Sequence, residues 1–202
     1  MRAVIIGNGI ISDYGYIRSK IKDSDYIICA DGGYKHSKKM DIIPDALIGD
    51  FDSLENFDGD LNIMKYPKRK DFTDGELCIE HAFEKGADEI VLFGMSGTRL
   101  DHTINNILML SRCEKACLID EHNEIYILKN HLEFENKKGK TLSIIPLKGD
   151  MEGIVTEGLE YPLCDETLYF GYARGNSNVV TADKCSISIK KGIGIVVIND
   201  GE

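Results

Sequence analysis

Hydrophobic residues in the first 120 positions form short apolar runs, which alternate with longer segments, two of them with the period of a helix. The runs predict strands at 3–6, 26–30, 45–49, 62–66, 89–94 and 116–120, and the periodic segments predict helices at 73–86 and 100–113. Strands that alternate with helices are typical of an α/β layer with a mostly parallel sheet. We therefore expect such a layer in the N-terminal part.

The pattern changes near Glu124. From there, short strand-like runs recur at small intervals with Gly, Asn and Asp between them, and no segment has a convincing helical period. This arrangement is typical of an all-β domain, either a sandwich or a barrel. We expect two domains, 1–123 and 124–202, with a boundary that falls near 122–125.

The net charge of the chain makes some classes of ligand unfavourable. The chain has 202 residues, a net charge of −10 and a pI near 5.0, so a nucleic acid or an anionic membrane is an unfavourable partner. A small molecule is a better candidate for the ligand.

The cysteines and the apolar runs bear on where the protein is located. The six cysteines include no C-x-x-C pair and are expected to be reduced. No run reaches membrane-spanning length and the start does not resemble a signal peptide, so a cytoplasmic protein is expected.

Acidic residues follow two of the predicted strands. Asp50 and Asp52 come directly after strand 45–49, and in extended backbone residues i and i+2 point to the same side, roughly 6.5 to 7 Å apart. Two like charges so placed need a cation, and Mg²⁺ is the usual one where phosphates bind. Asp31 and two glycines follow strand 26–30, at the same edge of the sheet. Ordinary turns, with Asp52 as a helix cap, are the alternative for both segments.

The start of helix 73–86 combines a cap with a basic segment. Thr73 and Glu76 have the spacing of a capping box, which places Asp74 in the first turn. Four basic residues stand just upstream, an unusual concentration in so acidic a chain: Lys65, Lys68, Arg69 and Lys70. The segment is either a solvated loop or a loop that faces phosphates beside Asp74.

A glycine-rich turn precedes helix 100–113. It contains Arg99, whose planar guanidinium suits phosphate oxygens, and Asp101 and His102 follow at the helix start. Asn105 lies four residues after Asp101, hence on the same face of the helix. A lone His at such a place is more often structural than catalytic, whereas the combination indicates a binding site. The segment "VIIGNGIIS" lacks the third glycine of a dinucleotide fingerprint, since position 12 is Ser, and is a weak signal.

These segments, in this order, resemble the signatures of the thiamin pyrophosphokinase family, also called thiamin diphosphokinases. The matching stretches are Ala30–Gly33, Pro44–Ser53, Lys70–Asp74 and Gly97–Asn105, with a fifth signature in 157–163 and 175–180. The resemblance spans nearly the whole chain. It implies an N-terminal α/β domain that binds ATP and Mg²⁺, a C-terminal β-sandwich that binds thiamin, and a homodimer with active sites between its subunits.

The resemblance also implies a reaction, in which ATP and thiamin give thiamin diphosphate and AMP. The Mg²⁺ ligands would be Asp50, Asp52 and Asp74. Arg99 would bind phosphate, Lys70 would reach a phosphate or the acceptor, and Asp31 would orient the acceptor or a metal-bound water. The nucleotide pocket would be formed by Thr73, Asp101, His102 and Asn105.

Thiamin would be bound by Tyr161, through cation–π attraction to its thiazolium of about 0.5–2 kcal/mol, and by Ser177 and Asn178. Two departures from the family pattern stand out. Leu77 and Cys78 occupy the places where many members of the family have Lys-Ala, so any role of that lysine in binding ATP cannot be transferred to this chain. Tyr161 stands where some members have Trp.

Two alternative functions would use the same ATP site. A related diphosphokinase would act on another primary alcohol such as a pterin, and a sensor would bind thiamin diphosphate or nucleotide without chemistry. A plain dinucleotide-binding protein ranks last, because it leaves the C-terminal domain and the Asp-x-Asp segment unexplained.

Overall fold

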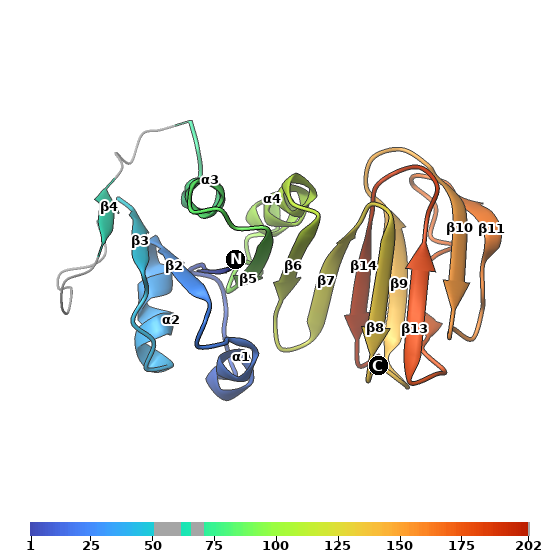
Figure 1. The fold of residues 1–202 in the computed structure, drawn as a ribbon, viewed down its shortest axis with the longest axis horizontal. Coiled ribbons are helices and arrows are strands. Elements are labelled where there is room, and N and C mark those ends of the chain that lie inside the picture. The colour runs from blue at the N-terminus through green and yellow to red at the C-terminus, as the bar shows by residue number, and fades with distance from the viewer. Residues whose placement is uncertain (51–61, 66–70, 202) are drawn as a thin grey trace. The chain divides into compact units, whose positions relative to one another are not determined.

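A computed structural model describes residues 1–50, 62–65 and 71–201 of the chain. The chain divides into two compact units, Met1–Glu121 and His122–Glu202. Figure 1 shows the first in blue to green and the second in yellow to red. The expected fold class is confirmed, with a mostly parallel α/β sheet in the first unit and antiparallel sheets in the second.

The first unit is built on a parallel sheet in the order β6-β5-β1-β2-β3-β4. Its strands are β1 (Arg2–Ile6), β2 (Tyr26–Ala30), β3 (Ala46–Gly49), β4 (Ile63–Lys65), β5 (Glu89–Phe93) and β6 (Lys115–Ile119). The central strands are apolar on both faces, with Val4, Ile5 and Ile6 all fully buried. This is the pattern of a parallel sheet covered by helices on both sides.

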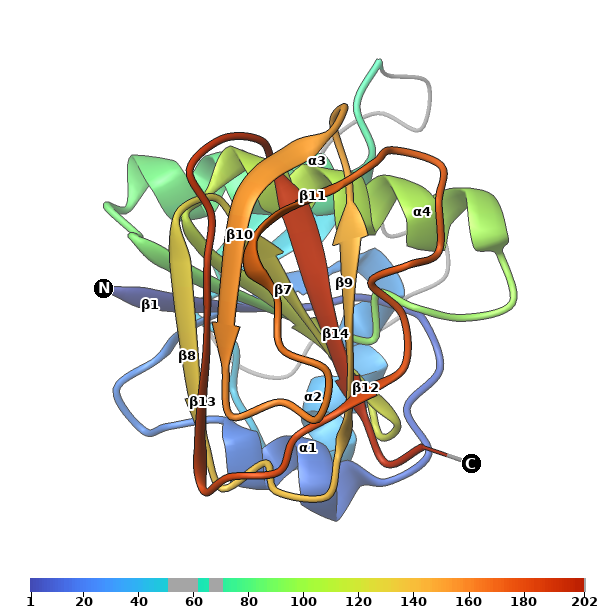
Figure 2. The ribbon, with the colours of Figure 1, turned by 90° about the vertical axis from the view of Figure 1, so that its right-hand side faces the viewer.

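Helices cover both faces of that sheet, α1 and α2 on one and α3 and α4 on the other (Figures 1 and 2). The helices are α1 (Tyr14–Lys20), α2 (Tyr34–Lys39), α3 (Asp74–Glu84) and α4 (Leu100–Met109), with short 3₁₀ turns at Asp31–Gly33 and Leu110–Arg112. The predicted capping box at α3 is present. The Glu76 N–H donates to Thr73 Oγ1 at 3.2 Å, and the Thr73 N–H donates to Glu76 Oε2 at 3.2 Å.

The strand order contains a switch point beside β1. The chain continues from β1 to β2, β3 and β4 on one side, then crosses to β5 and β6 on the other. The loops that leave β1 and β5 therefore turn to opposite faces of the sheet and leave a crevice beyond the carboxyl ends of the two strands. Ligands in open α/β sheets bind in such a crevice.

The second unit is an antiparallel β-sandwich. One sheet has the order β12-β9-β14-β7 and the other the order β11-β10-β13-β8. The strands are β7 (Asn123–Leu128), β8 (His131–Glu135), β9 (Thr141–Pro146), β10 (Met151–Glu157), β11 (Cys164–Leu168), β12 (Asn178–Val179), β13 (Lys184–Ser188) and β14 (Gly194–Asn199). Buried side chains from both sheets, such as Leu142, Ile154 and Val196, form one core. Strand β9 alternates buried and half-buried residues, as a sandwich strand should.

Among the residues that the structure describes, no helix is both long and apolar enough to cross a bilayer.

The packing of the first unit predicts a large difference between two identical substitutions. Ile28 on β2 is fully buried, whereas the side chain of Ile43, just before β3, is 83% exposed. Ile28→Ala should lower the free energy of unfolding by about 2–5 kcal/mol because it leaves a cavity in the core. Ile43→Ala should change it by less than about 0.5 kcal/mol. Urea denaturation of the two variants measures both values, and equal losses would contradict this description of the core.

Candidate active site

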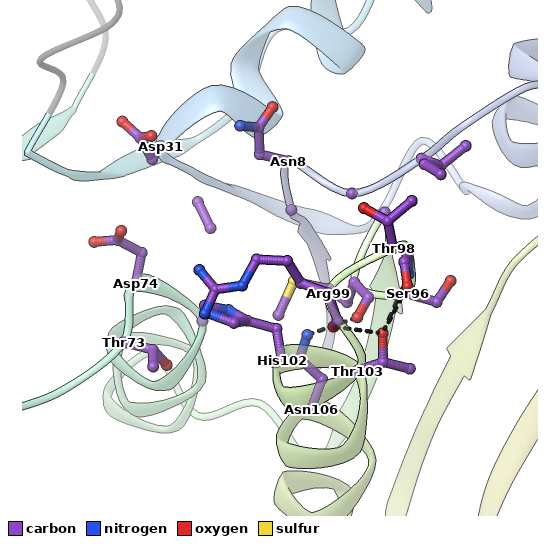
Figure 3. A pocket seen from close by; sticks show the side chains of 18 of the residues that line it. Asn8, Asp31, Thr73, Asp74, Ser96, Thr98, Arg99, His102, Thr103 and Asn106 are labelled. Carbon is purple, nitrogen blue, oxygen red and sulfur yellow. Dashed lines mark hydrogen bonds between the residues drawn. The ribbon is translucent and has the colours of Figure 1, made fainter.

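A cavity of about 520 Å³ lies at the carboxyl edge of the parallel sheet (Figure 3). Its walls come from the segments that follow β1, β2, β3 and β5 and from the first turns of α3 and α4. The strands are parallel, so their carboxyl ends meet at one edge, and the polar side chains that follow them converge there.

Two of the predicted acidic residues enter this cavity side by side. Asp31 follows β2 and Asp50 follows β3, and these strands pair with Ala30 opposite Ile48. The intervening Gly49 allows the close approach, because a Cβ atom on it would lie 2.9 Å from the Cβ of Asp31. The register of the two strands therefore places both acids on one rim.

The carboxylate of Asp31 is incompletely satisfied. Its Oδ1 is buried and has no hydrogen-bond partner among the described residues. The backbone of Asp31 has φ = +43°, a left-handed conformation that a non-glycine residue adopts at a cost. A buried carboxylate oxygen without a partner is unfavourable, so this atom is suited to a cation or to a hydrogen-bond donor of a ligand.

The start of α3 faces the same rim. Thr73 and Asp74 line the cavity, and Figure 3 shows them on the side where Asp31 lies. Gly75 lets the helix approach the β5 loop, because a Cβ atom there would lie 2.7 Å from Met95 Cε. The helix start thus contributes a carboxylate and backbone N–H groups at its positive end.

The predicted metal ligands are only partly described. Asp50 and Asp74 line the cavity, whereas Asp52 and also Lys70 lie outside the described residues. Within 1–50, 62–65 and 71–201, no group of three or more His, Cys, Asp or Glu residues is arranged to hold a metal ion. The donors that line the cavity include the carboxylates of Asp31, Asp50 and Asp74, the kind of ligand that Mg²⁺ prefers, and Oδ1 of Asp31 has no partner among the described residues. The residues fit such an ion, and the ligand set stays a prediction.

Arg99 stands at the N-cap position of α4 and reaches across the cavity toward the side of Asp74 (Figure 3). It donates hydrogen bonds to Asp101, from Nε to Oδ1 at 3.3 Å and from Nη2 to Oδ2 at 2.5 Å. These bonds lower the pKa of Asp101 and raise that of Arg99. Asp101 thus orients a guanidinium that keeps further N–H groups for phosphate oxygens.

Helix α4 presents a different set of residues to the cavity from the one expected. His102, Thr103 and Asn106 line it, whereas Asp101 and Asn105 are exposed and are not among the lining residues. Residues 102, 103 and 106 share a face of a 3.6-residue helix, with 101 and 105 beside it. Contact of Asp101 and Asn105 with ATP therefore stays a prediction.

Hydrogen bonds to backbone hold the inward face of α4. The buried Asn106 donates from Nδ2 to the Met95 carbonyl at 2.6 Å, and Thr103 Oγ1 accepts from the Gly97 N–H at 3.2 Å. Sequence reasoning missed both residues. The signal that could have found Asn106 is its spacing of four residues from His102.

The loop after β1 also forms part of the wall, although its incomplete glycine motif gave only a weak signal. Three of its N–H groups donate to the chain leaving β5: Gly7 to Phe93 O at 2.8 Å, Gly9 to Gly94 O at 2.6 Å and Ile10 to Ser96 O at 3.3 Å. A Cβ atom on Gly9 would lie 2.3 Å from the Ser96 carbonyl oxygen, so only glycine fits. Asn8, which the sequence did not single out, also lines the cavity.

The residues predicted to bind thiamin lie together in the second unit. The side-chain amide of Asn178 accepts from the Tyr161 N–H at 3.0 Å and donates to the Tyr161 carbonyl at 2.7 Å. It therefore fixes the backbone that carries the Tyr161 ring, which is exposed. Ser177 has φ = +58°, donates its N–H to Ser143 Oγ at 3.0 Å, and borders a polar cavity of about 640 Å³.

Family comparisons cover both units. Residues 17–127 match the thiamin pyrophosphokinase catalytic domain, and residues 126–194 match the thiamin pyrophosphokinase vitamin B1 binding domain. The chain is 32% identical to a thiamine pyrophosphokinase of Bacillus subtilis over 170 residues, which are 77% of this chain and 78% of that one. It is 24% identical to thiamine pyrophosphokinase 1 of Oryza sativa over 196 residues, which are 80% and 74% of the two chains.

Solved structures agree with this result. The crystal structure of the Bacillus subtilis thiamine pyrophosphokinase superposes with a TM-score of 0.89 at 26% identity, over the whole of both chains. A thiamin pyrophosphokinase from Candida albicans shares the fold, with a TM-score of 0.74 at 18% identity, over 98% of this chain and 88% of that one. The chain therefore belongs to the thiamin pyrophosphokinase family of enzymes.

Proposed function

We propose that the chain transfers the diphosphate group of ATP to the hydroxyl of thiamin, which gives thiamin diphosphate and AMP. The observation that carries this assignment is the cavity at the switch point, which combines acidic residues on one rim with Arg99 opposite them. The oxygen of the acceptor alcohol attacks the β-phosphorus and gives up its proton to solvent, the bond from that phosphorus to the α-phosphate oxygen breaks, and AMP leaves. Transfers of this kind depend mainly on positioning and charge neutralisation.

The acidic rim supports a role for Mg²⁺. In this proposal Asp50 and Asp74 hold the ion together with Asp52, which lies outside the described residues. The ion would neutralise charge on the phosphate oxygens. Arg99, oriented by Asp101, donates to a phosphate oxygen, and Thr73 and His102 border the nucleotide.

The acceptor gives a second reason for the acidic rim. Thiamin carries a permanent positive charge on its thiazolium, and Asp31 places a buried, unpartnered carboxylate oxygen at the cavity. We assign thiamin contacts to Tyr161 and Ser177, with Asn178 holding the Tyr161 backbone. Placement of the enzyme in the cytoplasm belongs to the same proposal.

The reaction predicts a specific pair of products. Purified protein incubated with ATP, Mg²⁺ and thiamin should form AMP and thiamin diphosphate in equal amounts, as resolved by chromatography, with neither product when thiamin is omitted. Thiamin monophosphate with ADP would mean a one-phosphate kinase. Turnover of a pterin but not thiamin would identify another acceptor, and tight binding of thiamin diphosphate without AMP formation would identify a sensor.

Removal of one rim carboxylate should abolish most of this activity. Asp50→Asn and Asp74→Asn keep the side-chain shape but remove a negative charge, and each should lower kcat by roughly 10²-fold or more. Asp23→Asn is the matched control, because that side chain is fully exposed and lies away from the cavity. Wild-type kcat in both rim variants would refute the assigned roles.

The homodimer implied by the family resemblance is part of the proposal. Sedimentation velocity at the protein concentration of the assay should give about twice the 22.6 kDa mass of one chain. Full activity in a sample that sediments as a monomer would contradict active sites shared between subunits.

A further inference from the structure

Three side chains form a hydrogen-bonded series that ends on the wall of the cavity. Lys39 Nζ lies 3.2 Å from the Tyr14 hydroxyl, that hydroxyl lies 2.9 Å from His36 Nδ1, and His36 Nε2 lies 2.9 Å from the Gly9 carbonyl oxygen. Tyr14 begins α1, and His36 and Lys39 lie on α2. The series therefore ties both helices on one face of the sheet to the loop after β1.

The chemistry of its two ends fixes the direction of the two outer hydrogen bonds. The Gly9 carbonyl can only accept, so His36 Nε2 carries a hydrogen. The Lys39 ammonium can only donate, so the Tyr14 oxygen accepts from it and keeps its own hydrogen for another acceptor. In the neutral His36 ring that acceptor is Nδ1, so the Gly9 carbonyl selects the Nε2–H tautomer and Tyr14 stabilises it.

The surroundings of His36 favour the neutral ring. Burial lowers the pKa of His36, and the positive charges of Lys39 and Lys35 act in the same direction, whereas the Gly9 hydrogen bond and Glu121 oppose them. A neutral imidazole can donate from only one nitrogen. The partner that selects the nitrogen therefore decides whether the Gly9 carbonyl has a donor.

Gly9 links two walls of the cavity. Its carbonyl accepts from His36, and its N–H donates to Gly94 O at 2.6 Å, in the loop that leads to Arg99. The next part of the loop has its own anchor, since Glu121 Oε1 accepts from the N–H groups of Ser12 at 2.5 Å and Asp13 at 2.9 Å. Without His36, Gly9 would lose the partner of its carbonyl while these other bonds remained.

We propose that His36 is a positioning residue for ATP binding, which holds the 7–10 loop against the β5–α4 loop, and that Tyr14 and Lys39 stabilise the tautomer that lets it do so. The inference rests on the proposed function in one respect, namely that ATP occupies the cavity which these loops border. It predicts that His36 acts on nucleotide affinity with little effect on the chemical step.

The kinetic test compares four variants of the full chain. His36→Leu removes the donor and should raise the KM for ATP roughly tenfold, with kcat changed less than about twofold. His36→Gln offers an amide N–H near the place of Nε2 and should restore the KM to within about threefold of wild type. Tyr14→Phe weakens the preference for the Nε2–H tautomer and should give an intermediate KM, whereas Tyr16→Phe removes a hydroxyl from the same helix, outside the series, and should change nothing.

A spectroscopic test is independent of activity. Nitrogen NMR of the imidazole near neutral pH should show His36 in the Nε2–H form in the wild type and a larger fraction of the Nδ1–H form in Tyr14→Phe, where the Gly9 carbonyl alone selects the tautomer, with no change in Tyr16→Phe. If His36→Leu does not fold, the kinetic test and the NMR test can both be made with Tyr14→Phe.

Three results would overturn the inference: an Nδ1–H ring in the wild type, an unchanged KM in His36→Leu and in Tyr14→Phe, or an equal loss of kcat and affinity in His36→Leu that His36→Gln does not rescue. Failure of the proposed function can be told apart from failure of this inference. If the proposed function is wrong, the wild type shows no turnover, but the tautomer of His36 measured by NMR is unaffected.

Discussion

Parallel pairing of β1 with both β2 and β5 is the constraint on which the active site depends. Because the strands point the same way, the segments that follow β1, β2, β3 and β5 all emerge at one edge of the sheet. Because the chain leaves β1 in one direction and returns on its other side at β5, the two loops meet beyond the carboxyl ends of these strands and together line the cavity. A binding site at this edge follows from the topology, and the side chains decide what it binds.

The side chains make the crevice selective for charge. A net charge of −10 disfavours polyanions in general, yet ATP must bind. The cavity holds groups of both charges. Asp31, Asp50 and Asp74 line it and suit cations, and Arg99 reaches in from α4 toward the side of Asp74 and suits phosphate. Oδ1 of Asp31 is buried and has no donor among the described residues, an unfavourable placement that suits this oxygen to a cation or to a donor of a ligand.

The sequence predicted the parts of the fold that have a strong local signal. Apolar runs bounded by turns located the six strands of the first unit, and the capping box located the start of α3. Helices α1 and α2 were not predicted, since a segment of six or seven residues is too short to show a period.

In the site, residues that belong to contiguous motifs were found, among them Asp50, Asp74 and Arg99. Residues that act through backbone contacts across the fold were missed, because no spacing in the sequence encodes them. Asn106 holds Met95, and His36 holds Gly9, which lies 27 positions away. The thiamin contact of Asn178 stays a prediction, and the hydrogen bonds of its amide to the backbone of Tyr161 are a second role that only the packed structure reveals.

The proposed function depends above all on ATP binding at the switch point between β1 and β5. Hydrogen–deuterium exchange with and without Mg²⁺ and a non-hydrolysable ATP analogue tests it most directly, because amide exchange reports binding without turnover. We expect slower exchange in the loops 7–10 and 94–99 and at the start of α3, with little change in the opposite ends of the same strands. Protection confined to other segments, or absent from these three at saturating analogue, would contradict it.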